Sequence, residues 1–97
     1  GAARSEEEIR KIMEQHKGAI YSIYNRALRQ NASLEGKMVV KIVIDPSGAI
    51  VEASLVSSEL GDKDLEGKIL QRIRMIRFPA SSVARTTINQ TFDFLPQ

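Results

Sequence analysis

The 97-residue sequence contains no cysteine and no tryptophan, and aromatic residues make up only 5% of it. Without cysteine the chain cannot form disulfide bonds, thiolate zinc sites or a cysteine nucleophile. This absence leaves the compartment open, because a cysteine-free chain persists in either redox environment. No apolar run approaches the roughly 18 residues of a membrane span, and no signal-peptide pattern opens the chain. If the protein is anchored or exported, we expect that segment to lie outside this sequence.

The net charge is also small, because 14 basic and 12 acidic side chains give +2 at pH 7. The field of the whole protein is therefore weak, and a charged partner surface must be local. Apolar residues at 42% and charged residues at 27% are typical of a globular domain. A chain of this length can bury one modest core. We predict one domain over residues 5–97, with residues 1–4 a cloning remnant or the end of a linker.

The first predicted element is a long amphipathic helix. Ser5 and Glu8 have the spacing of a capping box, and the acidic run that follows Ser5 favours the positive end of a helix dipole. Arg26 and Arg29 suit the opposite end, and residues 31–33 read as the exit. Apolar residues recur at intervals of three and four, which gathers them on one stripe. The stripe contains Ile9, Ile12, Met13, His16, Ile20, Ile23, Tyr24 and Ala27.

A β-hairpin is predicted next. Residues 37–44 and 49–56 alternate in the manner of strands, and between them Asp45, Pro46 and Gly48 have turn chemistry. Pro46 restricts its own φ, and Gly48 suits a positive φ. We expect one face of each strand to meet the core. These core positions are Met38, Val40, Ile42 and Ile44 in the first strand, and Val51, Ala53 and Leu55 in the second.

A second helix and a third strand complete the pattern. Asp62 or a neighbour caps the helix, and we expect it to end at Phe78-Pro79, because proline disfavours helical geometry in the residue before it. Residues 86–94 alternate as a strand. The helix stripe contains Leu65, Ile69, Ile73 and Ile76, and the strand's core face contains Ile88, Gln90, Phe92 and Phe94.

The predicted fold class is α+β, in the order α-β-β-α-β, with a three-stranded antiparallel sheet packed against two helices. A helix that crosses from the second strand to the last normally leaves the first strand central. The second and last strands are then the edges of the sheet.

Arginines are frequent near the second helix. Arg72, Arg74 and Arg77 point in different directions on a helical wheel, so they do not form the single basic face of a nucleic-acid-binding helix. We expect their stems to cover the core edge while their charged heads stay in water. Residues 67–92 contain no acidic side chain, so the local field, to which Arg85 also contributes, could steer an acidic peptide.

No residue pattern points to catalysis, so we predict that the protein is not an enzyme and needs no cofactor or small-molecule substrate. His16, the single histidine, has no second histidine or cysteine with which to build a metal site. We predict that it packs against the sheet. The serines lack a nucleophile-elbow context, and the glycines form neither a phosphate loop nor a dinucleotide fingerprint.

Several short motifs, taken together, resemble the C-terminal domain of TonB-like energy transducers, in the AgmX/PglI-type variant. The match spans residues 9–96, and the order and spacing of the motifs carry it. The motifs are Leu34-Glu35-Gly36-Lys37, Ile44-Asp45-Pro46-Ser47-Gly48, residues 51–58 with the sequence VEASLVSS, residues 73–79 with the sequence IRMIRFP, and Phe92-Asp93-Phe94. Within them Gly36, Asp45, Pro46, Gly48, Phe78 and Pro79 are the structural motif residues.

The resemblance implies a periplasmic domain, joined by a linker and one transmembrane helix to an inner-membrane motor of the ExbB/ExbD kind. Such a domain grips outer-membrane receptors and transmits force for transport. In this family a short receptor segment, the TonB box, adds as an extra strand beside the last strand of the domain. The implied partner-binding residues are Thr86, Thr87, Ile88, Asn89, Gln90, Thr91, Phe92, Asp93 and Phe94, to which we add Arg72, Arg74, Arg77 and Arg85 as steering charges.

Two alternatives stay open at this point. One is an RNA-binding module of the KH kind, which has a similar element order, although the sequence lacks the Gly-x-x-Gly loop that clamps a nucleic-acid backbone. Phe92 and Phe94 are predicted to face the core, so they offer no stacking platform, and we expect no nucleic-acid partner. The other alternative is a structural envelope domain that dimerises by edge-strand pairing.

Overall fold

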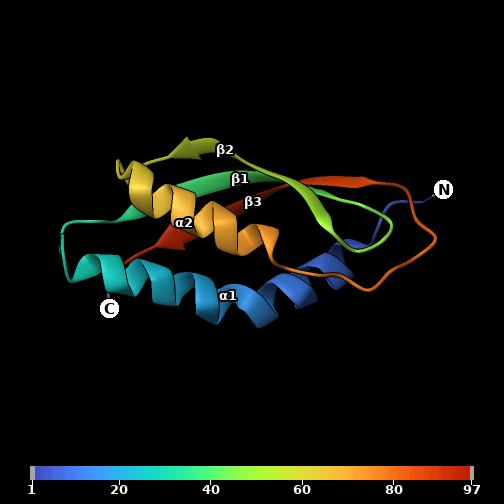
Figure 1. Cartoon of the computed structure of the whole chain (residues 1–97), viewed down its shortest axis with the longest axis horizontal. Coiled ribbons are helices and arrows are strands. Elements are labelled where there is room, and N and C mark those ends of the chain that lie inside the picture. Colours follow the sequence, from blue (N-terminus) through green and yellow to red (C-terminus); the bar gives the residue numbers. More distant parts are fainter. Residues whose placement is uncertain (1, 97) are drawn as a thin grey trace.

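The computed structural model describes residues 2–96 and forms two layers, a sheet and a pair of helices (Figure 1). The observed order is the predicted α-β-β-α-β. The protein is elongated, with extents of 45 × 22 × 18 Å. The elements are α1 (Glu6–Leu28), β1 (Gly36–Ile44), β2 (Ile50–Ser58), α2 (Lys63–Arg74) and β3 (Thr86–Phe94).

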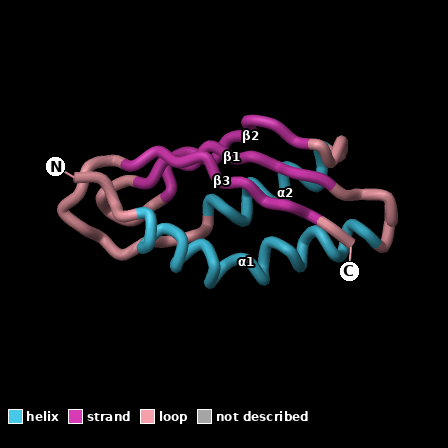
Figure 2. The backbone as a smooth tube through the Cα atoms, turned by 180° about the vertical axis from the view of Figure 1, so that it is seen from behind, coloured by secondary structure: helices cyan, strands magenta, loops and turns pink. Residues whose placement is uncertain are grey.

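The sheet has the order β2-β1-β3, and β1 pairs antiparallel with both neighbours. The prediction of a central first strand with the second and last strands at the edges is therefore confirmed. Both helices lie on one face of the sheet, and β3 is the strand next to α1 (Figure 2). No helix among residues 2–96 covers the opposite face of the sheet.

The core lies between this sheet and the two helices. Every second residue of β1, from Met38 to Ile44, is fully buried there, as its alternation predicts. From α1 the core receives the apolar stripe, including Ile20 and Tyr24. The Tyr24 ring packs 4.9 Å from the ring of Phe94, and its hydroxyl donates to the carbonyl of Leu34 at 2.6 Å. Burial, with a smaller contribution from the charge of Glu35, raises the pKa of Tyr24.

The predicted core face of β2 is wrong in part. The pairing of β1 with β2 shifts register twice, and each shift leaves one unpaired β2 residue, Val51 and Val56. These two bulge residues are 51% and 56% exposed, whereas Ala53 is buried as predicted. Leu55 lies opposite Val40, on the core side, but it is 41% exposed because it sits at the sheet edge. Simple alternation misplaces side chains wherever a bulge inserts an extra residue.

The predicted end of the second helix is also wrong. Helix α2 ends at Arg74, with Met75 as its C-cap, four residues before Phe78. Ile76 is buried as predicted, but it lies in the segment after the helix. That segment forms an isolated antiparallel bridge between Arg77 and Ala49, and the Phe78 N–H donates to the Gly48 carbonyl at 2.8 Å. In the segment after Arg74, hydrogen bonds to the hairpin turn thus replace helical hydrogen bonds. The helix therefore ends before Pro79.

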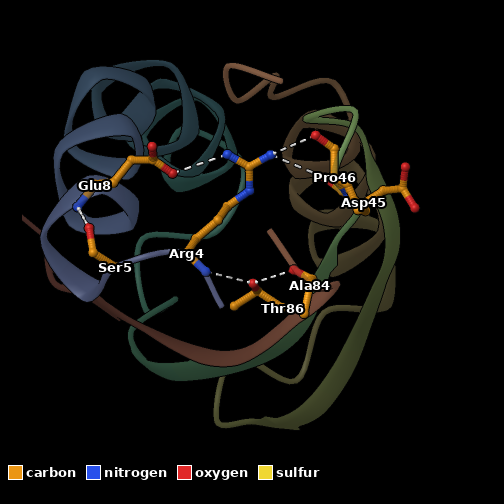
Figure 3. Close-up of polar contacts among 7 residues, drawn as sticks. All are labelled: Arg4, Ser5, Glu8, Asp45, Pro46, Ala84 and Thr86. Carbon is orange, nitrogen blue, oxygen red and sulfur yellow. Dashed lines mark hydrogen bonds and ion pairs between the residues drawn. The ribbon is translucent and has the colours of Figure 1, made fainter. Parts of the chain in front are cut away.

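A buried arginine closes the end of the core near the β1–β2 turn (Figure 3). Arg4 extends its guanidinium between α1 and the turn. It forms an ion pair with Glu8 at 3.1 Å and donates to the carbonyls of Asp45 and Pro46, each at 3.2 Å. The guanidinium carbon lies 5.5 Å from the centre of the Phe78 ring, which is within cation–π range.

The backbone before α1 is bound to the start of β3 as well. The Arg4 N–H donates to the Thr86 hydroxyl at 3.1 Å, and the Ala84 N–H donates to the Ala2 carbonyl at 2.9 Å. We refer to residues 2–4 as the N-terminal strap. The assignment of residues 1–4 to a remnant or linker end stays a prediction, and residue 1 lies outside the described residues. The strap itself is integrated into the fold.

We predict that Gly48→Ala destabilises the protein by about 2–6 kcal/mol. Gly48 has a φ of 96°, and a Cβ there would lie 1.8 Å from the carbonyl oxygen of Phe78. The cost combines backbone strain of about 1–3 kcal/mol with overpacking of about 1–3 kcal/mol. Urea denaturation measures it.

Gly18→Ala is the matched control, because Gly18 lies within α1 and a Cβ there meets nothing within 4 Å. This change should stabilise the protein by about 0.5–1 kcal/mol, since alanine favours a helix over glycine. If the two variants shifted stability alike, the close approach at Gly48 would not be what constrains the turn.

Candidate functional site: the free edge of β3

A definite set of backbone groups points to the outer edge of β3, away from β1. The Tyr21 hydroxyl of α1 donates to the Asp93 carbonyl at 3.0 Å, so this carbonyl points away from β1. In an antiparallel pair, residues alternate between those that bond to the partner strand and those that do not. Thr87, Asn89 and Thr91 each lie an even number of residues from Asp93 along the strand. Their N–H and C=O groups therefore also point to the free edge.

Contacts on the other side of β1 agree with this alternation. The Lys37 carbonyl accepts from the Glu59 N–H, which follows β2, so Lys37 faces β2 rather than its β3 partner Asp93. On β2, the Arg74 guanidinium reaches the Ala53 carbonyl at 2.7 Å, so that carbonyl points away from β1. Ala53 lies opposite Ile42, which by the same alternation bonds to β3. Three independent contacts thus give one assignment.

A groove of about 240 Å³ follows this edge between β3 and α1. Its lining is apolar toward the core and charged along the α1 side, where Glu14 and Lys17 form an exposed ion pair at 3.7 Å. Such a shape suits an extended segment, which needs backbone partners on one side and room for side chains on the other. The lining residues are Glu6, Ile9, Arg10, Met13, Glu14, Lys17, Ile88, Asn89, Gln90 and Phe92.

The β2 edge is different. Its two bulges interrupt the regular spacing of backbone groups, and the Arg74 guanidinium covers the outward carbonyl of Ala53. Bulges and covering groups are the usual means by which a protein protects an exposed sheet edge. The pairing of β3 with β1 has no bulge, so its outward backbone groups are evenly spaced, and those covered are the carbonyls of Thr91, by the Gln90 side chain, and of Asp93, by Tyr21. Of the two edges, β3 is the better template for an added strand.

The structure separates the four candidate arginines from one another and from the groove. Each of them has its own intramolecular contact. None of them is among the residues that line the groove beside β3. Arg72 lies 3.2 Å from the Nδ1 atom of His16, between the two helices, and Arg74 binds Ala53. Arg77, in the segment after α2, donates to the carbonyls of Arg74 and Ile76, and Arg85 pairs with Asp45 at 3.2 Å. Their role as steering charges stays a prediction.

The predicted docking strand matches β3 in its bounds, Thr86–Phe94. Its side chains divide between three environments. Thr86, Phe92 and Phe94 are buried, Ile88 and Gln90 are half-buried at the groove, and Thr87, Asn89, Thr91 and Asp93 are exposed. The α1 side of the groove, Tyr21 and the strap were not predicted from the sequence. The signal available for α1 was the charged row flanking its apolar stripe, at Glu6, Arg10, Glu14 and Lys17.

Within residues 2–96, no group of three or more histidine, aspartate or glutamate side chains is arranged to hold a metal ion. No helix in that part of the chain is both long enough and apolar enough to span a bilayer. His16 is half-buried, and its polar contact is with Arg72 of α2.

Comparisons with known proteins identify the fold. No model of a known protein family matches the sequence, and no curated protein matches it. Among solved structures, the chain is similar to the solution structure of the TonB C-terminal domain of Helicobacter pylori, with a TM-score of 0.66 and 21% identity. The match covers 97% of this chain and 85% of that one. The α-β-β-α-β arrangement of helices and sheet is thus the TonB C-terminal fold.

Acid should weaken the turn that borders the site. Hydrogen bonds from Ser47, and then from the Arg85 guanidinium, lower the pKa of the Asp45 carboxyl. In the unfolded chain an aspartate has a pKa of about 3.9. Since the folded pKa is lower, Asp45 contributes stability above about pH 4, and this contribution is lost as pH falls through the folded value.

We therefore predict that the stability difference between the wild type and Asp45→Asn narrows as pH falls from about 5 to about 2. Urea denaturation across this range measures the difference. If the difference in free energy of unfolding stayed constant with pH, the carboxylate charge of Asp45 would contribute nothing to the stability of the turn.

Proposed function

Because the chain has the fold of a TonB C-terminal domain, we propose that it is the periplasmic binding domain of a TonB-like energy transducer. In this role it grips an outer-membrane receptor by adding the receptor's TonB box as a strand beside β3. The observation that carries the proposal is the open β3 edge, where the backbone groups of Thr87, Asn89 and Thr91 point outward beside a groove.

Strand addition here would use two kinds of contact. Main-chain hydrogen bonds to β3 supply affinity that depends little on partner sequence, and alternate side chains supply register. The partner's inward side chains would lie over the apolar part of the groove, formed by Ile9, Met13, Ile88 and Phe92. The outward side chains would join Thr87, Asn89 and Thr91 on the open face of the sheet. No bond is made or broken in the partner, so the domain acts by holding and not by turnover.

Energy transduction requires a connection to a proton-driven motor. In our proposal an upstream linker and one transmembrane helix anchor the domain to the inner membrane, where an ExbB/ExbD-like complex supplies the force. The domain transmits that force to the receptor and so drives transport. The position of the strap supports this arrangement, because an upstream segment would enter the domain at Arg4, beside the start of β3.

A pair of proline substitutions tests the docking edge. Thr91→Pro removes an N–H that points to the free edge, which an edge strand tolerates. It should leave the fold intact and weaken binding of a TonB-box peptide about tenfold or more, because one main-chain bond is lost and the proline ring blocks close pairing. Titration with amide-shift monitoring measures the affinity.

Gln90→Pro is the matched change on the other side of the same strand. Its N–H bonds to β1, so this variant should lose about 3 kcal/mol or more of folding stability. If a folded Thr91→Pro variant bound the peptide as the wild type does, or if the peptide moved the amides of β2 instead, the docking edge would be wrongly assigned. RNA binding at micromolar affinity with a steep salt dependence would favour the KH-like alternative.

The arginines in and just after α2 are expected to act on the rate of association. Replacing Arg72, Arg74 and Arg77 together by glutamine removes three exposed or half-exposed charges, and such charges typically contribute little to stability. The association rate with an acidic receptor peptide should fall about threefold to tenfold at low salt, with little change in thermal stability. A large loss of stability at an unchanged rate would assign these arginines to structure instead.

A further inference from the structure

We infer that Tyr21 limits the length of the docked strand, so that the partner pairs with β3 only along Thr87–Thr91. This inference rests on the proposed function and deepens it. Tyr21 is not among the residues that the family resemblance brings to the site. Its role follows from where its ring and hydroxyl lie relative to the β3 edge.

Tyr21 occupies the last outward carbonyl of β3. Its hydroxyl donates to the Asp93 carbonyl at 3.0 Å, which a partner strand would otherwise use. The ring is held in place by Phe94, whose ring centre lies 4.9 Å away, and by Lys17, whose ammonium lies 5.9 Å from the Tyr21 ring centre. An added strand that continued past Thr91 would have to break this bond, and the packed ring keeps the hydroxyl from turning aside.

Tyr21 also marks a division in the space between α1 and β3. The groove described above runs along α1 as far as Lys17. A second hollow, of about 630 Å³, begins at Lys17 and is lined further by Gly18, Tyr21, Asp93, Leu95 and Pro96. Lys17 borders both hollows. A partner backbone that follows β3 through the first hollow therefore meets Tyr21 at its exit.

At the opposite end, the docking window begins where β3 begins, at Thr86, and the strap is bound there. The Ala84 N–H already donates to the Ala2 carbonyl, and Thr86 bonds to the Arg4 backbone through its hydroxyl. Between the strap and Tyr21, the outward residues are Thr87, Asn89 and Thr91. This window spans five residues, or about 17 Å of strand.

One outward group inside the window is also covered, but in a different way. The Gln90 side-chain amide donates to the Thr91 carbonyl at 3.3 Å. Gln90 is half-buried and its side chain is a flexible amide, so a rotamer change uncovers the carbonyl. The cover at Asp93 cannot be removed in this way, since the Tyr21 ring is packed against Phe94.

Tyr21→Phe tests the inference, because it removes the hydroxyl and keeps the ring on Phe94. The probes are capped peptides of alternating valine and threonine, with five and nine residues. For the wild type, affinity should be equal for both lengths within about twofold. For Tyr21→Phe, the nine-residue peptide should bind about fivefold more tightly than the five-residue peptide, the gain expected from one additional net hydrogen bond.

The Asp93 carbonyl carbon provides a second readout. Its ¹³C resonance should stay in place when the nine-residue peptide binds the wild type, and it should shift when that peptide binds Tyr21→Phe. Tyr24→Phe is the matched control, since it deletes the same atom from the neighbouring tyrosine, whose hydroxyl bonds to Leu34 inside the core. It should lower stability but leave the affinities of the two peptides equal.

The outcomes separate the two proposals. If either peptide protects the amides of Thr87, Asn89 and Thr91 but the wild type gains affinity with length, or Tyr21→Phe does not, the role of Tyr21 is overturned while strand addition stands. If neither peptide nor a TonB-box peptide protects β3 amides, strand addition itself fails and the inference fails with it.

Discussion

The central strand β1 divides its backbone hydrogen bonds between two neighbours, and the character of both sheet edges depends on that division. Residues such as Ile42 bond to β3, so the opposing Ala53 of β2 must direct its carbonyl outward, where Arg74 binds it. By the same alternation, Thr87, Asn89 and Thr91 direct their backbone outward from β3. A shift of one residue in register would exchange these roles and expose the buried face of β1.

The elements that sequence predicts well are those whose signals are local. The bounds of β3 match, and α1 begins at its capping box, because the Ser5 hydroxyl accepts from the Glu8 N–H within one turn. The errors arise where distant contacts decide. Bulges at Val51 and Val56 depend on how β2 pairs with β1, and α2 ends early because the following segment bonds to the hairpin turn.

The candidate site divides in the same way. The prediction of a docking strand follows from a family resemblance and from the topology of the sheet, both of which are readable in the sequence. The direction of each backbone group is not, since it requires a reference contact such as that of Tyr21 with Asp93, seventy-two residues apart. Arg4 is a similar case, because a single arginine before a helix cap has no pattern to distinguish it from a linker residue. Only the arrangement of Glu8, Asp45 and Phe78 around it creates a buried site.

The attachment of the strap beside Thr86 has a mechanical consequence. A force on an upstream segment would reach the domain at one end of β3, and β3 runs roughly along the protein's longest axis, which measures 45 Å (Figure 1). A force along that axis would act along the strand. A partner whose chain leaves near Asp93 would be loaded from the opposite end. The hydrogen bonds between the two strands would then be stretched together, in shear, rather than opened one after another as in a zipper. A short junction can hold under such loading while remaining weak enough at rest to dissociate.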